Sequence, residues 1–287
     1  MSSATIRSHR KADALATIAV WSSALLVSAM FGWIILDLVR HGLGNLSLSF
    51  LLDAPRDAGR AGGIGPIVVS TLWITAICMV TALPVGIGTA ALLAEGTNDR
   101  GRFGRLVRRS LDALAAVPSI VFGLFGSAVF CIHLGMGFSI LSGGLTLACM
   151  VLPIVIRTAE EGIRSVPDGY RQAAAALGIS RTATLMKVLL PAAAPALAAG
   201  LVLGVGRALA ETAALIFTSG YVDRMPRSPF DSGRAMSVHI YDLAMNVPGG
   251  NANAHATALV LVGVLLLINA AASWLVQAWL RKGAVRA

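Results

Sequence analysis

The chain has 287 residues, of which 56% are hydrophobic and 13% are charged, and its mean hydropathy is +0.76. A soluble domain has about a quarter of its residues charged, so the composition excludes that class and indicates an all-α polytopic membrane protein. The net charge of +9 does not indicate binding to nucleic acid, because the basic residues lie in short stretches between apolar runs.

About six apolar runs are long enough to cross a bilayer as helices. In chain order they cover residues 14–36, 66–94, 111–133, 138–156, 192–218 and 256–280. We therefore divide the chain into an N-terminal segment (1–13), a transmembrane domain (14–280) and a tail (281–287). The start resembles a signal peptide, but its apolar run is too long and has no clear cleavage site, so we expect it to be retained as a helix.

The basic residues predict the orientation of these spans. With six spans both termini share one side, and the segments on that side hold 16 of the 23 Lys and Arg residues, against 6 on the other side. Cytoplasmic loops are enriched in Lys and Arg. We therefore expect both termini to be cytoplasmic.

The longest cytoplasmic segment is the loop 157–190, between the fourth and fifth spans. Pro167 before Asp168 is typical of a helix start, the Ala-rich stretch that follows favours helix, and Gly178 supplies a stop. A second short helix is expected up to residue 190, with Pro191 opening the fifth span. The sequence thus predicts two short helices on the cytoplasmic surface.

Arg207 and Glu211 lie inside the fifth run. A residue about 11 positions past the point where such a helix enters the bilayer is ~16 Å deep, near the middle of a ~30 Å hydrocarbon core. A charge at that depth costs ~2.5–3.5 kcal/mol, so these residues are expected to face a pathway or a partner. Their i,i+4 spacing places both on one helix face. The pair is either a charged station on a translocation path or a structural bridge between helices. The pattern favours the charged station.

The segment 220–255 lies between the fifth and sixth spans, on the outer side. Its Pro and Gly residues indicate loop, and residues 235–245 are expected to form a short interfacial helix or gate element. The segment is either a dock for a substrate-binding protein or a solvated loop.

The sequence has no phosphate-cradling G-x-x-x-x-G-K-[ST] loop and no carboxylate pair or Ser/His/Asp arrangement at catalytic spacing. Its three cysteines, Cys78, Cys131 and Cys149, are isolated and have no metal-ligand spacing. We therefore expect neither an enzyme nor a chain that binds its own cofactor or metal.

The cytoplasmic loop resembles the EAA loop of ABC importer permeases. The matching residues are Gln172, Ala173, Ala174, Gly178, Leu190 and Pro191. In that family the loop forms coupling helices that dock into a groove on an ATPase subunit. Gln172 stands where the family usually has Glu, so the length is retained and the charge is lost. The resemblance implies an ABC importer permease fold, with these residues in ATPase coupling.

Further stretches narrow the resemblance to the phosphate-uptake permeases, closest to the PstA-type subunit, over roughly residues 62–280. They are Gly62-Gly63-Ile64-Gly65-Pro66-Ile67, Ser70-Thr71-Leu72, Leu83-Pro84-Val85-Gly86-Ile87-Gly88, Val117-Pro118-Ser119-Ile120-Val121-Phe122-Gly123-Leu124-Phe125, Arg157-Thr158-Ala159-Glu160-Glu161 and Arg207-Ala208-Leu209-Ala210-Glu211-Thr212-Ala213. The family commonly has Gly where this chain has Ala210. The resemblance implies that Arg207, Glu211 and Thr212 lie on the substrate path.

The function implied is a permease subunit of an ATP-driven importer of inorganic phosphate in the bacterial cell membrane. A planar guanidinium at Arg207 suits phosphate oxygens. Glu211 either neutralises Arg207 while the path is empty or accepts a hydrogen bond from the proton that phosphate retains. Alternatives are a permease for another oxyanion such as sulfate or molybdate, an ion-coupled secondary transporter, and a scaffold that signals phosphate status.

The resemblance also implies the partners. They are a dimer of ATPase subunits that would hold ATP and Mg²⁺, a second homologous permease in a heterodimer, an extracytoplasmic phosphate-binding protein, and membrane lipid.

Overall fold

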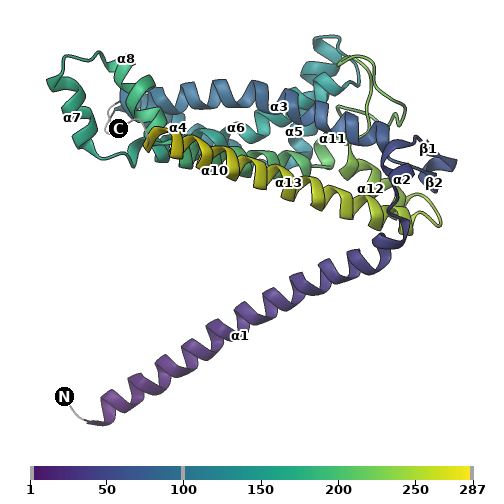
Figure 1. The fold of residues 1–287 in the computed structure, drawn as a ribbon, viewed down its shortest axis with the longest axis horizontal. Coiled ribbons are helices and arrows are strands. Elements are labelled where there is room, and N and C mark those ends of the chain that lie inside the picture. Colours follow the sequence, from purple (N-terminus) through teal and green to yellow (C-terminus); the bar gives the residue numbers. More distant parts are fainter. Residues whose placement is uncertain (1–2, 98–100, 285–287) are drawn as a thin grey trace.

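The computed structural model describes residues 3–97 and 101–284 (Figure 1). Its longer helices are α1 (Ser3–Gly42), α3 (Gly65–Ala91), α4 (Arg102–Ala115), α6 (Ile140–Arg164), α10 (Ala194–Leu209), α12 (Met236–Met245) and α13 (Asn251–Ala284). Shorter ones are α2 (Leu48–Leu52), α5 (Ser119–Gly126), α7 (Asp168–Ala176), α8 (Arg181–Thr184), α9 (Leu190–Ala192) and α11 (Ala213–Ile216). Three π-helical turns, Leu92–Gly96, Ser127–His133 and Leu185–Leu189, extend α3, α5 and α8, and two 3-10 turns cover Leu43–Asn45 and Asp57–Gly59. Strands β1 (Pro55–Arg56) and β2 (Ala61–Gly62) pair antiparallel.

The expected all-α membrane architecture is confirmed. By length and composition, α1, α3, α6 and α13 can each cross a membrane, and the described residues give up to six spans if each of two bent helix pairs counts as one. Of the terminal segments expected at 1–13 and 281–287, residues 1–2 and 285–287 lie outside the described part of the chain.

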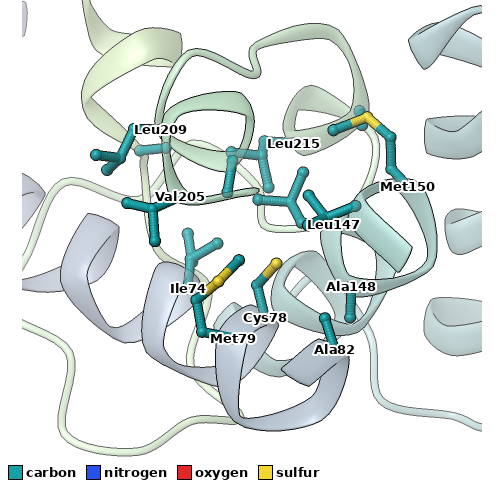
Figure 2. Close-up of a cluster of buried hydrophobic side chains, with 14 of the residues drawn as sticks. Ile74, Cys78, Met79, Ala82, Leu147, Ala148, Met150, Val205, Leu209 and Leu215 are labelled. Atoms are coloured by element: carbon teal, nitrogen blue, oxygen red, sulfur yellow. The ribbon is translucent and has the colours of Figure 1, made fainter. Parts of the chain in front are cut away.

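The core lies where α3, α6 and α10 pack together, with α11 at one end. Figure 2 shows side chains from these helices directed at one another: Ile74, Cys78, Met79, Ala82, Leu147, Ala148, Met150, Val205, Leu209 and Leu215. A small residue brings two of the helices close, since a Cβ at Gly204 of α10 would lie 2.9 Å from Val151 of α6. Cys78 is fully buried among these side chains and packs as a small hydrophobe.

Helix α1 stands away from the rest of the molecule (Figure 1). Its side chains from 15 to 36 are exposed, as expected for a helix whose surroundings are apolar lipid or another chain. Its principal contact is with α13, at the C-terminal end of α1.

The third expected span, 111–133, is wrong as a single helix. Residues 111–115 complete α4, an amphipathic helix with four arginines, and the chain then turns by 100° before α5 and its π-helical extension to His133. The bend falls at Pro118, because proline disfavours the helical conformation at the preceding residue, Val117. An apolar run continues through such a bend unchanged, so hydropathy does not reveal it.

The fifth expected span, 192–218, is also broken. Pro191 does not open it: Pro191 lies in α9, the chain bends by 69° at Ala193, and Pro195 occupies the first turn of α10. Helix α10 then ends at Leu209, before the four-residue helix α11.

Other boundaries agree with the sequence or extend it. Helix α7 begins at Asp168 after Pro167, and the expected short helix at 235–245 is α12. Helix α6 continues to Arg164, so the first residues of the expected loop 157–190 are helical.

Candidate substrate path and coupling surface

Arg207 lies in the last turn of α10, where the negative end of the helix dipole favours a cation. Its side chain is 49% exposed, whereas that of Glu211 is 6% exposed. Nη2 of Arg207 is 3.9 Å from Oε2 of Glu211, so the pair is at the outer limit of an ion pair. The guanidinium therefore keeps donors available for another acceptor.

Glu211 occupies the break between α10 and α11. Its Oε1 accepts a hydrogen bond from the N–H of Ala214 at 3.2 Å, and its main-chain oxygen accepts one from Ser237 Oγ of α12 at 2.5 Å. The buried carboxylate thus caps α11 and the main chain beside it is tied to α12. Thr212 is partly buried and directly precedes α11. Ala210 directly follows α10 and is exposed.

Asn269 is a polar residue in the last span that sequence analysis missed. With Arg207 it lines an open pocket of about 530 Å³ between α6, α10 and α13. Among the described residues, its buried Oδ1 has no hydrogen-bond partner. A buried amide oxygen without a partner carries a desolvation penalty. The signal was present in the sequence, because an Asn interrupts the apolar run around residue 269.

Of the residues expected to couple to an ATPase, four lie on α7 and the turn after it, at one end of the molecule (Figure 1). Gln172 and Ala173 are exposed, whereas Ala174 is buried. Gly178 has φ +70°, the left-handed conformation that glycine adopts without strain. A Cβ there would meet nothing within 4 Å among the described atoms, so the backbone conformation and not close packing requires glycine. Leu190 and Pro191 lie beyond α8, in α9, and are partly buried.

Arg171 anchors α7 to the π-helical turn that extends α3. Its Nε and Nη2 donate to Oε1 of Glu95 at 3.0 and 2.8 Å. Its Nη1 and Nη2 also donate to the carbonyls of Val166 and Ile163 at 2.7 and 3.0 Å, and Nη1 contacts Asp168 at 3.2 Å. These contacts tie α7 to the ends of α3 and α6.

A second charged cluster lies nearby, around Glu160 of α6. Its Oε1 accepts from Nε of Arg108 at 2.8 Å and from Nε of Arg164 at 3.1 Å. Both arginines also donate to the main-chain oxygen of Leu93, at 3.2 and 3.0 Å. They thereby satisfy a carbonyl at the end of a helix, where intrahelical partners are missing. The cluster joins α4 and α6 to the end of α3.

The outer segment packs around His239 of α12, which is 1% exposed. Nη1 of Arg234 lies 3.3 Å from Nδ1 of His239, and 3.2 Å from Oδ2 of Asp242. Burial, and then the charge of Arg234, lower the pKa of His239 to about 4, against the opposing effect of Asp242. Because Arg234 has only donors, the imidazole is neutral and its Nδ1 accepts.

The helices are long and apolar enough to span a membrane, one of them is broken beside a charged pair, and a helical loop lies at one end. Together these features define a membrane permease component. The family described as "Binding-protein-dependent transport system inner membrane component" matches residues 82–282, and the chain belongs to it. It is a transport subunit of the membrane and not an enzyme.

Curated relatives cover most of the chain. It is 31% identical over 278 residues to the probable ABC transporter permease protein YqgI of Bacillus subtilis. This alignment covers 92% of the present chain and 94% of YqgI. The chain is 34% identical over 216 residues to the phosphate transport system permease protein PstA 1 of Mycobacterium tuberculosis, covering 74% of this chain and 70% of that one.

Solved structures show the same fold. A bacterial ABC transporter involved in the import of alginate matches with a TM-score of 0.63 at 14% identity, over 96% of this chain and 99% of that chain. The methionine ABC transporter MetNI, in an inward-facing conformation, matches with a TM-score of 0.57 at 19% identity, over 76% and 94%. The fold is that of an ABC importer permease.

Proposed function

We propose that the chain forms part of the translocation path for inorganic phosphate in an ATP-driven importer. The assignment of phosphate as the substrate rests on the similarity to permeases named for phosphate transport, which covers 74% of the chain in one case. Sulfate or molybdate is the runner-up. Membership of a binding-protein-dependent family favours this class over an ion-coupled secondary transporter.

In this proposal Arg207 is the station that phosphate meets. It is half-exposed at a helix end, it lines an open pocket, and its partner Glu211 neutralises it without occupying all its donors. A guanidinium offers two parallel N–H groups to two phosphate oxygens, which an ammonium does not. Thr212 lies next to the same helix break.

The partners follow from the same proposal. The exposed residues Gln172, Ala173 and Gly178 would contact one subunit of an ATPase dimer, with the buried Ala174 packing behind them. ATP and Mg²⁺ would be held by that dimer and not by this chain. A second, homologous permease would complete the path, and an extracytoplasmic binding protein would deliver phosphate to the end bearing α12. The excess of Lys and Arg supports cytoplasmic termini in the bacterial cell membrane.

Uptake by the complete transporter in proteoliposomes tests the function. We expect ATP-dependent uptake of ³²P-phosphate that vanadate stops and that excess sulfate or molybdate leaves unchanged. Uptake that persists with vanadate would contradict an ATP-driven mechanism, and competition by sulfate would assign the other oxyanion class.

The role of Arg207 is tested in the same vesicles. Arg207→Ala should lower uptake at least a hundredfold while the complex still assembles, and Arg207→Lys should be intermediate. Arg105→Ala, which removes an exposed arginine from α4, is the matched control and should transport normally. Near-normal uptake by Arg207→Ala would make the pair structural.

A further inference from the structure

Three side chains with metal-ligating atoms meet where α1 ends beside the start of α13. Asp37 and His41 are four positions apart on α1, and His255 lies in the first turns of α13. Their ligand atoms all lie within 4.8 Å of one another. The junction is at the end of the molecule opposite α7 and α8 (Figure 1), far from the coupling surface.

The separations suit a shared ion. Nδ1 of His41 is 3.1 Å from Oδ1 of Asp37 and 3.1 Å from its main-chain oxygen, so its N–H donates to Asp37 and an ion at Nδ1 would replace that proton. Nε2 of His255 is 3.6 Å from Oδ2 of the same carboxylate. Ligand atoms that surround a tetrahedral zinc ion at 2.0–2.1 Å are roughly 3.4 Å apart. The two histidine rings lie side by side, with centroids 5.4 Å apart. Small side-chain rotations therefore suffice to bring the three ligands around one ion.

A hydrogen bond orients the ring of His255. Its Nδ1 lies 2.6 Å from the main-chain oxygen of Asn251, to which it donates. Nδ1 is therefore engaged, and Nε2 is the ring nitrogen that faces Asp37. Histidines that bind metals are commonly oriented by such a hydrogen bond from the other ring nitrogen.

The backbone holds the two helices in this register. A Cβ at Gly42 would lie 2.8 Å from the main-chain oxygen of His255, so only glycine allows the contact. One turn further, Nδ2 of Asn45 donates to Oδ1 of Asn253 at 3.2 Å, and Nδ2 of Asn253 donates to the carbonyls of Gly59 and Arg60. The ligands are thus brought together by contacts that do not depend on an ion.

We propose that Asp37, His41 and His255 bind a divalent transition-metal ion, zinc in particular, which fastens α1 to α13. Two imidazoles and one carboxylate are a ligand set of zinc, whereas calcium and magnesium prefer oxygen ligands alone. The His41 side chain is 62% exposed, so the ion enters from solvent and a water completes its coordination. Because α1 extends away from the body beyond this junction, an ion here stabilises its attachment.

Direct metal counting tests this proposal. The complete transporter, purified with a tag that lacks histidine and stripped with a chelator, is dialysed against micromolar zinc, and bound zinc is measured by mass spectrometry. Wild type should hold one more zinc per copy of this chain than the double variant His41→Gln/His255→Gln. Asp37→Asn, which retains the shape of the site, should weaken zinc affinity at least tenfold. Co²⁺ in wild type should give the visible absorption of a tetrahedral site.

His133→Gln, which removes another exposed histidine, is the matched control and should bind zinc as wild type does. Equal zinc in wild type and in the double variant would overturn the proposal. Displacement of zinc by excess calcium would also overturn it, because calcium competes poorly for imidazole.

Discussion

Arg207 and Glu211 lie on opposite sides of a helix end. Arg207 closes α10, Glu211 caps α11, and the 3.9 Å between their charged groups crosses the break. The dipole of α10 stabilises Arg207 at its C-terminal end, and the hydrogen bond from the N–H of Ala214 stabilises Glu211. This arrangement lowers the penalty of placing the pair in a span.

The position of Glu211 favours charge balance over recognition of the phosphate proton. Glu211→Gln retains an oxygen that can cap Ala214 but removes the charge opposite Arg207. We expect slower phosphate turnover and no entry of sulfate, measured as ³²P and ³⁵S flux with a variant transporter that hydrolyses ATP without the binding protein. Sulfate flux above wild type would instead support proton recognition. Glu211→Ala loses the cap as well, at about 1 kcal/mol of stability.

Gly178→Val should uncouple ATP hydrolysis from uptake. A β-branched residue in the left-handed conformation is strained by roughly 1–2 kcal/mol, which shifts the turn after α7. Gly169→Val is the matched control: a Cβ there meets nothing within 4 Å among the described atoms, and its φ is not positive. ATPase activity and phosphate uptake are measured together. Normal coupling in Gly178→Val would remove the turn from the coupling mechanism.

Glu160→Gln should destabilise the permease. Glu160 is 5% exposed and faces two guanidiniums, and removing one partner of a buried ion pair costs about 3 kcal/mol. Thermal unfolding of the purified protein measures the loss, and Glu161→Gln, an exposed neighbour, should unfold as wild type does. Equal unfolding temperatures for the two variants would show that the cluster contributes little.

Asn269→Leu should separate stability from transport. Replacing an amide whose Oδ1 is buried without a partner in the described structure raises stability by about 1 kcal/mol. If the pocket shared with Arg207 belongs to the path, phosphate uptake falls at the same time. Leu265→Met, which alters the same wall without a polar change, should retain uptake. A variant that is more stable and fully active would place the pocket outside the path.

The stability of the outer segment should fall in mild acid. The pKa of His239 is about 4 in the folded chain, below the ordinary value of 6.5, so the unfolded chain takes up the proton first. Stability is full above pH 6.5 and declines by about 3 kcal/mol as the pH falls towards 4. Unfolding temperatures across this range should show a weaker dependence in His239→Gln than in wild type. His133→Gln should match wild type.

The sequence predicts those elements whose causes are local. Asp168 after a proline, the left-handed glycine at 178 and the long apolar helices all depend on residues within a few positions. The residues of the candidate path could be named because a charge in an apolar run is conspicuous.

The break after α10 could not be predicted, because a distant residue stabilises it. The end of α10 at Leu209 has neither Pro nor Gly to mark it, and the freed main chain is held by Ser237, which is far away in sequence. Likewise, the sequence does not predict that Glu160 forms an ion pair, because its partner Arg108 lies in a different helix. Hydropathy reports where a chain is apolar but not where it turns.

The attachment of α1 has a consequence for biosynthesis. Its principal contact, at Gly42, is with α13, which is synthesised after all the other described helices. Translation at about 5–20 residues per second leaves α1 waiting for roughly 10–40 s before His255 is available. During that interval α1 has no access to this contact, and it packs against α13 only after residue 255 has been made.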